Sequence, residues 1–348
     1  MGTYIYGIVP TDKEVTVAVD GVSRQPGGIH TIPCNDIAAV VGPSDLDDYR
    51  GLGREELVRV LLDHQRVVEQ VMHSYGILPA KFSTVLADEQ RVTELLTKGH
   101  DLFRRKLDEF EGCVQMEVVV QWDLQEVFAD IGRDARVVQL SALAEAAAKE
   151  QARELQIRVG RMVGTLLAER RAAHQASLLP RLRECGREAV SNPCMDESMV
   201  LNLALLTDRD GQTRLDGLLP ELDEEFGGRL VFRCVGPLPP YNFASVEVEC
   251  PSFSDIDRSR RILDLPEMVT AREVKEAFRR KASRIHPDAN PDSVDNVTEM
   301  SDLSSAYALL SRYVKSDPGD GSATHRLDVP SVEKALLFDV VRQQALGD

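Results

Sequence analysis

The feature that constrains the fold most is a proline-rich stretch at 236–240, Gly-Pro-Leu-Pro-Pro, which follows a short apolar run at 230–235. Proline has no N–H to donate to a sheet, so we expect the strand to end near Gly236. Beyond the prolines, Tyr241 and Phe243 are two residues apart, a spacing that points both rings to one side of an extended chain. Alternating apolar and polar residues then predict a second strand with one exposed face.

Composition limits the class of protein. The chain has 348 residues, 43% of them hydrophobic and 28% charged, and this length favours two or three domains. A net charge of −16 argues against nucleic acid as a partner, because phosphate contacts need a basic surface. No signal-peptide pattern opens the chain, and no apolar run approaches the ~20 residues that span a bilayer. We therefore expect a cytoplasmic protein with no membrane partner.

Patterns that would indicate catalysis or metal binding are weak. Acidic neighbours such as Glu224 and Glu225 point apart, the histidines lack ligand spacing, and the glycines form no phosphate-binding loop. The six cysteines are scattered without a Cys-x-x-Cys pair, which is typical of reduced thiols. His64 lies on the apolar stripe of a predicted helix at 54–75, where a packed core histidine is expected rather than a catalytic one. We expect no enzyme activity, cofactor or metal site.

Hydrophobic periodicity predicts two α+β domains in the first 250 residues. The first, at 1–112, is expected to contain a loop at 11–28, strands at 4–9, 37–41 and 77–86, and helices at 54–75 and from Asp88 to Gly112. The second, at 113–250, is expected to contain strands at 114–122, 187–192, 198–207 and 230–235, a long helix at 137–179, a turn at 208–211 and a helix ending at Gly227. Its order of strand, helix, strand, strand, helix, strand is ferredoxin-like.

A different pattern follows in a segment expected to form a small all-α domain at 251–315, ahead of a tail at 316–348. Thr270 and Glu273 form a capping box before an amphipathic helix that ends at a His-Pro-Asp tripeptide. A return helix predicts a hairpin of two helices. The hairpin core is expected to contain Phe278, Tyr307 and Leu310. The basic face of the first helix is expected to contain Lys275, Arg279, Arg280 and Arg284.

This segment resembles the J domain of DnaJ-type cochaperones. The matching residues are Ile262–Leu265, Val274–Ala282, His286, Pro287, Asp288, Asn290-Pro291, Ala306-Tyr307 and Leu310-Ser311. The resemblance implies that the basic helix and the His286-Pro287-Asp288 loop dock on a DnaK-type ATPase and stimulate hydrolysis. The chain departs from the family at Arg260, Asp264, Ser283 and Ala289. A helical hairpin that serves only as a docking tail is the alternative.

The body resembles the gas vesicle protein GvpL/GvpF family over about residues 4–249. The matching segments are Tyr4–Pro10, Ile37–Val41, Leu78–Val85, Val118–Asp123, Leu201–Leu206 and, most specifically, the stretch that holds Gly236, Pro237, Pro239, Pro240, Tyr241 and Phe243. The resemblance implies a gas vesicle protein that binds the hydrophobic shell protein, limits its aggregation during vesicle nucleation, and meets other accessory proteins. An exposed apolar shell subunit would need such cover before it assembles. The alternative is a general J-domain cochaperone whose α+β body binds clients.

Overall fold

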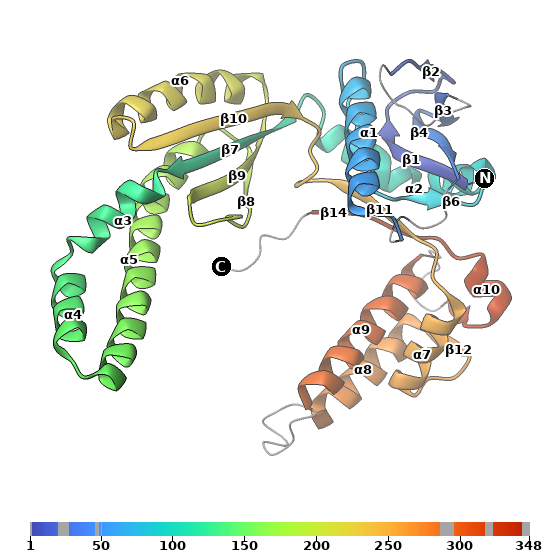
Figure 1. Cartoon of the computed structure of the whole chain (residues 1–348). Helices are drawn as coiled ribbons and strands as arrows, with labels where there is room; N and C mark the ends of the chain where they lie inside the picture. The colour runs from blue at the N-terminus through green and yellow to red at the C-terminus, as the bar shows by residue number, and fades with distance from the viewer. Residues whose placement is uncertain are drawn as a thin grey trace.

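The computed structural model describes residues 2–19, 28–45, 49, 51–285, 296–316 and 323–342 of this mixed α/β protein. Two units that each combine a sheet with helices lie next to each other, and a helical unit lies below the first of them in the view of Figure 1. The first and second units correspond to the body of the chain. The third contains the segment with the basic amphipathic helix.

The first unit is an antiparallel sheet with helices on both faces. Its elements are β1 (Gly2–Val9), β2 (Thr16–Val17), β3 (Ile29–Cys34), β4 (Ile37–Ser44), α1 (Arg54–Met72), β5 (Leu78–Pro79), β6 (Val85–Leu86) and α2 (Glu89–Glu109). The strands follow the order β2-β3-β4-β1-β5, and β6 also pairs with β1. Along β1, Tyr4 packs toward α1 while Ile5 packs toward α2. The two faces therefore have separate cores, as the period of two in a strand requires.

The second unit is an antiparallel sheet in the order β10-β7-β9-β8. Its elements are β7 (Val114–Trp122), α3 (Leu124–Gly132), α4 (Ala135–Ala146), α5 (Lys149–Arg183), β8 (Glu188–Ser191), β9 (Met199–Thr207), α6 (Arg209–Phe226) and β10 (Leu230–Leu238). The succession of strand, helix, strand, strand, helix and strand is the predicted one, with three helices in the first helical position. Helices α5 and α6 cover one face. On the other face, Ala204 and Leu206 join the core beneath α2.

The third unit is mainly helical and contains a short strand pair. Its elements are α7 (Phe253–Leu263), β12 (Met268–Thr270), α8 (Ala271–Ile285), α9 (Asn296–Lys315), β13 (Thr324–Arg326) and α10 (Val329–Glu333). The predicted capping box forms: Glu273 N–H donates to Thr270 Oγ1 (3.2 Å), and Thr270 N–H donates to Glu273 Oε2 (2.8 Å). Strand β12 precedes α8 and pairs with β13, which follows α9. This pairing joins the two ends of the helical hairpin.

Both ends of the third unit are anchored on the body. The strand that enters it, β11 (Ser245–Glu249), pairs antiparallel with the strand that leaves it, β14 (Leu337–Val341). Leu336 lies in the core beneath α2, whereas its neighbour Leu337 lies in the core of the helical unit. Arg342 forms ion pairs with Glu109 on α2 (3.3 Å) and Glu188 on β8 (2.7 Å). Residues 323–342, which lie in the segment expected as a tail, thus connect all three units.

The single helix expected at 137–179 is wrong. Ala147 and Ala148 are extended, with ψ values of 154° and 151°, and they separate α4 from α5. Helix α5 then continues to Arg183. Alanine favours helix, so local propensity predicts no break, but the reversal lets α4 fold back on α5 and bury Ala144.

Three smaller expectations also differ. The strand expected at 77–86 is two short strands, which pair with β1 in the same direction and are interrupted between them, where Ser83 has a φ of 69°. The turn expected at 208–211 is the start of α6, where the Asp208 carboxylate accepts the Gly211 N–H (2.9 Å). Strand β2 lies in the segment expected as a loop, and β3 precedes the predicted strand at 37–41.

Replacing Leu336 with Ala tests whether the C-terminal segment stabilises the body. Leu336 is 1% exposed, so its truncation should lower the free energy of unfolding by about 2–5 kcal/mol, measured by urea denaturation. Asp339→Ala, at an exposed position of β14, is the matched control and should change the free energy by less than about 0.5 kcal/mol. Equal effects of the two substitutions would contradict the prediction.

Candidate functional site

The strand before the prolines is longer than expected. Strand β10 does not stop at Gly236 but continues to Leu238, across an irregularity in its pairing with β7 that begins at Val235. It is an edge strand, so no neighbouring strand on its outer side needs the N–H group that Pro237 lacks. Gly236 has a φ of +151°, and a Cβ there would lie 2.9 Å from the Gln115 carbonyl oxygen. A side chain at this position would therefore collide with β7.

The residues after the prolines form a turn rather than an extended chain. The N–H groups of Phe243 and Ala244 both donate to the Pro240 carbonyl, at 2.9 and 2.8 Å. Tyr241 consequently joins the cluster on the α1 face, while Phe243 joins the core on the α2 face. The expectation that both rings point to one side is wrong, because it assumed an extended backbone. Pro239 and Pro240 are both buried at the turn.

A buried amide pair fixes this turn to the second sheet. Asn242 N–H donates to Gln115 Oε1 (2.9 Å), and Gln115 Nε2 donates to Asn242 Oδ1 (2.8 Å). Asn242 Nδ2 also donates to Asn192 Oδ1 (2.8 Å). Sequence reasoning missed both members of the pair. A polar residue between two aromatic ones was the only signal for Asn242, and nothing in the sequence marks its partner, which lies 127 positions away.

The turn forms one wall of a groove of about 640 Å³ between the first and second units. Its lining is mostly apolar and comes from α1, the segment that follows β5, the turn, and the strands β7, β10, β11 and β14 with the residue after β14. The lining residues are Leu61, His64, Gln65, Ala80, Lys81, Phe82, Glu117, Val235, Leu238, Tyr241, Ser245, Val341 and Arg342. The Tyr241 hydroxyl is buried and has no hydrogen-bond partner among the described residues. Its burial also raises the pKa of this hydroxyl above the usual range.

His64 closes the inner end of the groove as a packed side chain, as the sequence predicts. It is 3% exposed, and its Nδ1 lies 2.9 Å from the Tyr4 hydroxyl. Its ring stacks on Tyr6 and meets Phe82 edge-on, with centroid distances of 5.7 and 5.9 Å. Burial lowers the pKa of His64 to about 4, although a hydrogen bond with the Ala80 backbone acts to raise this pKa. The imidazole is therefore neutral at pH 7.

An exposed apolar stripe on α1 borders the groove. Leu57, Val58, Leu61 and Leu62 are 38%, 48%, 45% and 45% exposed, although the opposite face of the same helix is buried. Val235, on the free edge of β10, is 53% exposed and lines the groove too. Apolar side chains that gather at one place on a surface are typical of a protein-binding site.

A second candidate surface lies on α8. The structure places Lys275, Arg279, Arg280 and Arg284 exposed on this helix. On its inner side, the rings of Phe278 and Tyr307 stack at a centroid distance of 4.3 Å, above the buried Leu310. Within the described part of the chain, the four basic residues form no ion pair. His286, Pro287 and Asp288 lie outside the described residues.

The described residues contain no group of three or more His, Cys, Asp or Glu side chains that could hold a metal ion. In the same part of the chain, no helix is both long and apolar enough to cross a membrane. What these surfaces offer is apolar area and positive charge, which suit protein partners.

Comparison with known proteins gives two matches along the chain. The model of the gas vesicle synthesis protein GvpL/GvpF family matches residues 2–245, and that of the DnaJ domain matches residues 261–317. Gas vesicle protein F of Dolichospermum flosaquae is 23% identical over 254 residues, which cover 70% of this chain and 98% of that protein. Gas vesicle protein L2 of Halobacterium salinarum is 26% identical over 266 residues, which cover 70% of this chain and 91% of that protein.

The fold has a counterpart among solved structures. The crystal structure of the gas vesicle protein GvpF from Anabaena sp. PCC7120 superimposes with a TM-score of 0.57 and 23% identity, covering 69% of this chain and 96% of that chain. The helical unit has its own relative: a DnaJ homolog subfamily C member 5 homolog of Drosophila melanogaster is 36% identical over 59 residues, 17% of this chain and 24% of that protein.

The neutral His64 predicts a pH dependence of stability. Its pKa is about 4 when folded, below the ordinary value of 6.5, so the unfolded chain binds a proton that the folded chain does not. This stabilisation is fully present above pH 6.5 and is lost as the pH falls toward 4, by about 3 kcal/mol. Urea denaturation at pH 7, 5.5 and 4 should show this loss in the wild type and not in His64→Gln. Replacing the exposed His73 with Gln should leave the loss in place. Identical pH profiles for wild type and His64→Gln would contradict the prediction.

Proposed function

Because the chain belongs to the gas vesicle synthesis protein GvpL/GvpF family and carries a DnaJ domain, we propose that it is a gas vesicle accessory protein that binds the hydrophobic shell protein. In this role it limits aggregation of the shell protein during vesicle nucleation, alongside other accessory proteins. The DnaJ domain recruits a DnaK-type ATPase to the same complex. The α+β body and the helical unit then act on one client.

The observation that carries this proposal is the apolar groove next to the exposed stripe on α1. A shell subunit must hide its apolar face until it assembles, and burial of apolar area is the main driving force for such contacts. Leu61 on α1 and Val235 on β10 line the same opening, so an apolar helix could lie between α1 and β10. Leu57 lies one helical turn before Leu61 and extends the apolar stripe beside this opening.

The free edge of β10 adds a second means of contact. An edge strand presents unpaired backbone N–H and carbonyl groups, to which an extended segment of another chain can add. Val231 and Val235 on this strand are 49% and 53% exposed. Pro237 interrupts the donors near the end of the strand, which limits pairing with a further copy of the same edge.

The anchoring of the helical unit supports a joint action of groove and DnaJ domain. Strands β11 and β14 hold both ends of that unit, and Arg312 on α9 forms an ion pair with Glu249 on β11 (2.7 Å). An ATPase bound on the basic face of α8 would therefore be held at a fixed place relative to a client in the groove. The alternative function is a general J-domain cochaperone, in which the groove accepts unrelated apolar clients.

Substitution on the α1 stripe tests the groove. Each buried leucine contributes about 1.5 kcal/mol, so Leu57→Gln combined with Leu61→Gln should weaken binding of shell protein on the order of a hundredfold. The measurement is protection of purified shell protein from aggregation by light scattering, together with titration. Met195→Gln, at an apolar position that is 80% exposed away from the groove, is the matched control and should behave as wild type.

The same assay with an unrelated aggregating client separates the two functions. Protection of the shell protein alone supports the gas vesicle function, and equal protection of both clients supports the general cochaperone. If the double variant protects shell protein as well as Met195→Gln does, the groove is not the binding site.

The basic face of α8 gives a separate prediction. Arg279→Gln combined with Arg280→Gln should lower stimulation of a DnaK-type ATPase at least about tenfold, because each lost charge-assisted contact is worth about 1.5–3 kcal/mol. His286→Gln should have the same effect. Arg272→Gln is the control on the same helix, since Arg272 is already paired with Glu276 (2.7 Å). Full stimulation by the double variant would contradict this prediction. A wild-type chain that gives no stimulation would instead favour a helical hairpin that serves only as a docking tail.

A further inference from the structure

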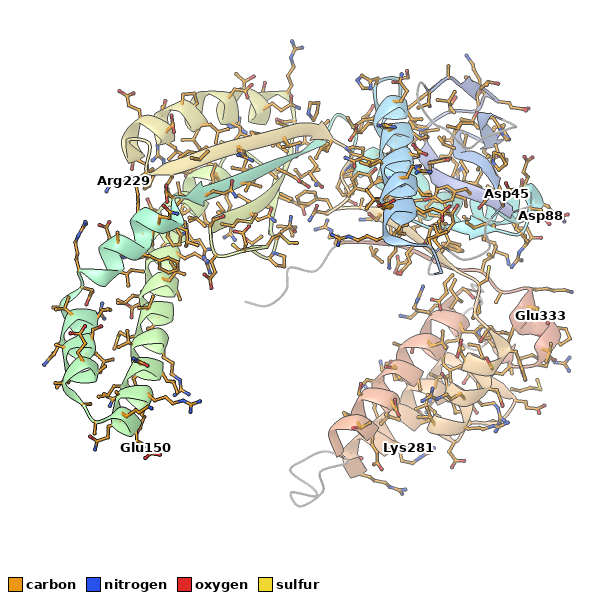
Figure 2. All side chains as sticks on the ribbon, viewed as in Figure 1. Asp45, Asp88, Glu150, Arg229, Lys281 and Glu333 are labelled. Atoms are coloured by element: carbon orange, nitrogen blue, oxygen red, sulfur yellow. The ribbon has the colours of Figure 1, made fainter. Side chains whose placement is uncertain are left out.

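The hairpin of α4 and α5 projects from the second sheet as an arm (Figure 1), with Glu150 at its tip (Figure 2). From residue 149 to 165, no side chain of α5 is fully buried, whereas further along the helix the leucines enter the core of the second unit. Leu143 and Ile157 on the arm are 54% and 52% exposed. A hairpin of two helices cannot cover its own apolar residues on both sides, so one face of the arm is left without a partner.

A hollow of about 580 Å³ runs along this face, between the two helices. Its lining is apolar, basic and neutral polar, without any carboxylate: Arg136, Gln139, Leu140, Leu143, Arg158, Arg161, Met162 and Thr165. Arg136 is neutralised by Asp134 (3.1 Å) and Glu169 (3.7 Å). Arg158 and Arg161 form no ion pair among the described residues.

The charges on α5 are ordered along the arm. Glu150, Glu154, Arg158 and Arg161 follow each other at steps of three or four residues, so they share one face of the helix. The acidic pair lies in the half toward the tip, and the basic pair lies in the half toward the body. All four are exposed, and within the part of the chain that the structure describes none of them forms an ion pair.

We propose that this face of the arm binds the same face of a second copy of this chain, with the two α5 helices antiparallel and crossing near residue 156. In that arrangement Glu154 of each copy faces Arg158 of the other. Glu150 likewise comes close to Arg161 of the other copy, because the rise of about 1.5 Å per residue places them roughly 9 and 7.5 Å from the crossing point. Each contact occurs twice, as the two-fold symmetry of a dimer requires.

The order of charges selects this partner over others. A parallel pair of arms would place glutamate against glutamate, and an acidic helix from another protein would be repelled by Glu150 and Glu154. The antiparallel pair of hairpins makes a bundle of four helices, in which Leu143 and Ile157 gain cover. The arm lies away from the groove and the DnaJ domain, so this pairing leaves both surfaces free.

Charge reversal of the full-length protein tests the pairing by sedimentation and light scattering. Wild type should be a dimer that dissociates as salt is raised. Glu154→Arg and Arg158→Glu should each raise the dissociation constant at least about tenfold, because like charges then face each other twice. Mixing the two variants should restore a dimer with one copy of each, since every arginine again faces a glutamate. Lys149→Glu, on the opposite face of α5, is the matched control and should dimerise as wild type does.

Circular dichroism of each variant verifies that the helices are intact before the comparison. A wild-type chain that stays monomeric overturns the proposal. It is also overturned if the single reversals dimerise as tightly as Lys149→Glu, or if their mixture stays monomeric. The monomeric variants should still bind shell protein, because their groove is unchanged. Loss of dimerisation with retained binding therefore tests the arm separately from the proposed function.

Discussion

The pairing of β11 with β14 is the interaction on which the arrangement of the units depends. Residue Val246 of β11 also bridges to Ala80 in the first unit, and the Lys81 N–H donates to the Val246 carbonyl (2.8 Å). The chain therefore leaves the body and returns to it at one place. Leu336 belongs to the core of the body and Leu337 to the core of the helical unit. Because the two residues are neighbours in the chain, displacing one from its core also disturbs the other core. The DnaJ domain is thus inserted between two paired strands, which hold it at both ends.

This arrangement has a consequence for the groove. Its walls come from α1, β7, β10, the turn after the prolines, and β14, so the site exists only when both body units and the C-terminal strand are assembled. A partner in the groove would contact all of them at once. Its binding energy would then stabilise the same junction that holds the DnaJ domain, because a ligand that binds only the assembled state shifts the equilibrium toward that state.

Local chemistry was readable from the sequence where the residues that interact are close together in the chain. Asp88 caps α2, Thr270 and Glu273 form their box, and Gly227 ends α6 with a φ of 58°. The failures share a different origin. The break at Ala147, the bulged course of β10 beyond Val235 and the turn at Tyr241 are set by packing against distant segments, which propensity and spacing do not contain. Pairing of β14 with β11 also joins residues about 90 positions apart, and no local pattern indicates it.

The two candidate sites differ in the same way. The basic face of α8 was visible as a helical repeat, whereas the groove depends on Gln115 and Asn242, which meet only in the folded chain. Charge gives a further reason to connect these surfaces with partners. With 57 acidic and 41 basic residues, the chain has carboxylates in excess for its lysines and arginines. Arginines that remain without an ion pair among the described residues, such as Arg158 and Arg279, are therefore placed where the chain's own acids do not reach. Arginines at such positions can pair with a carboxylate of another molecule.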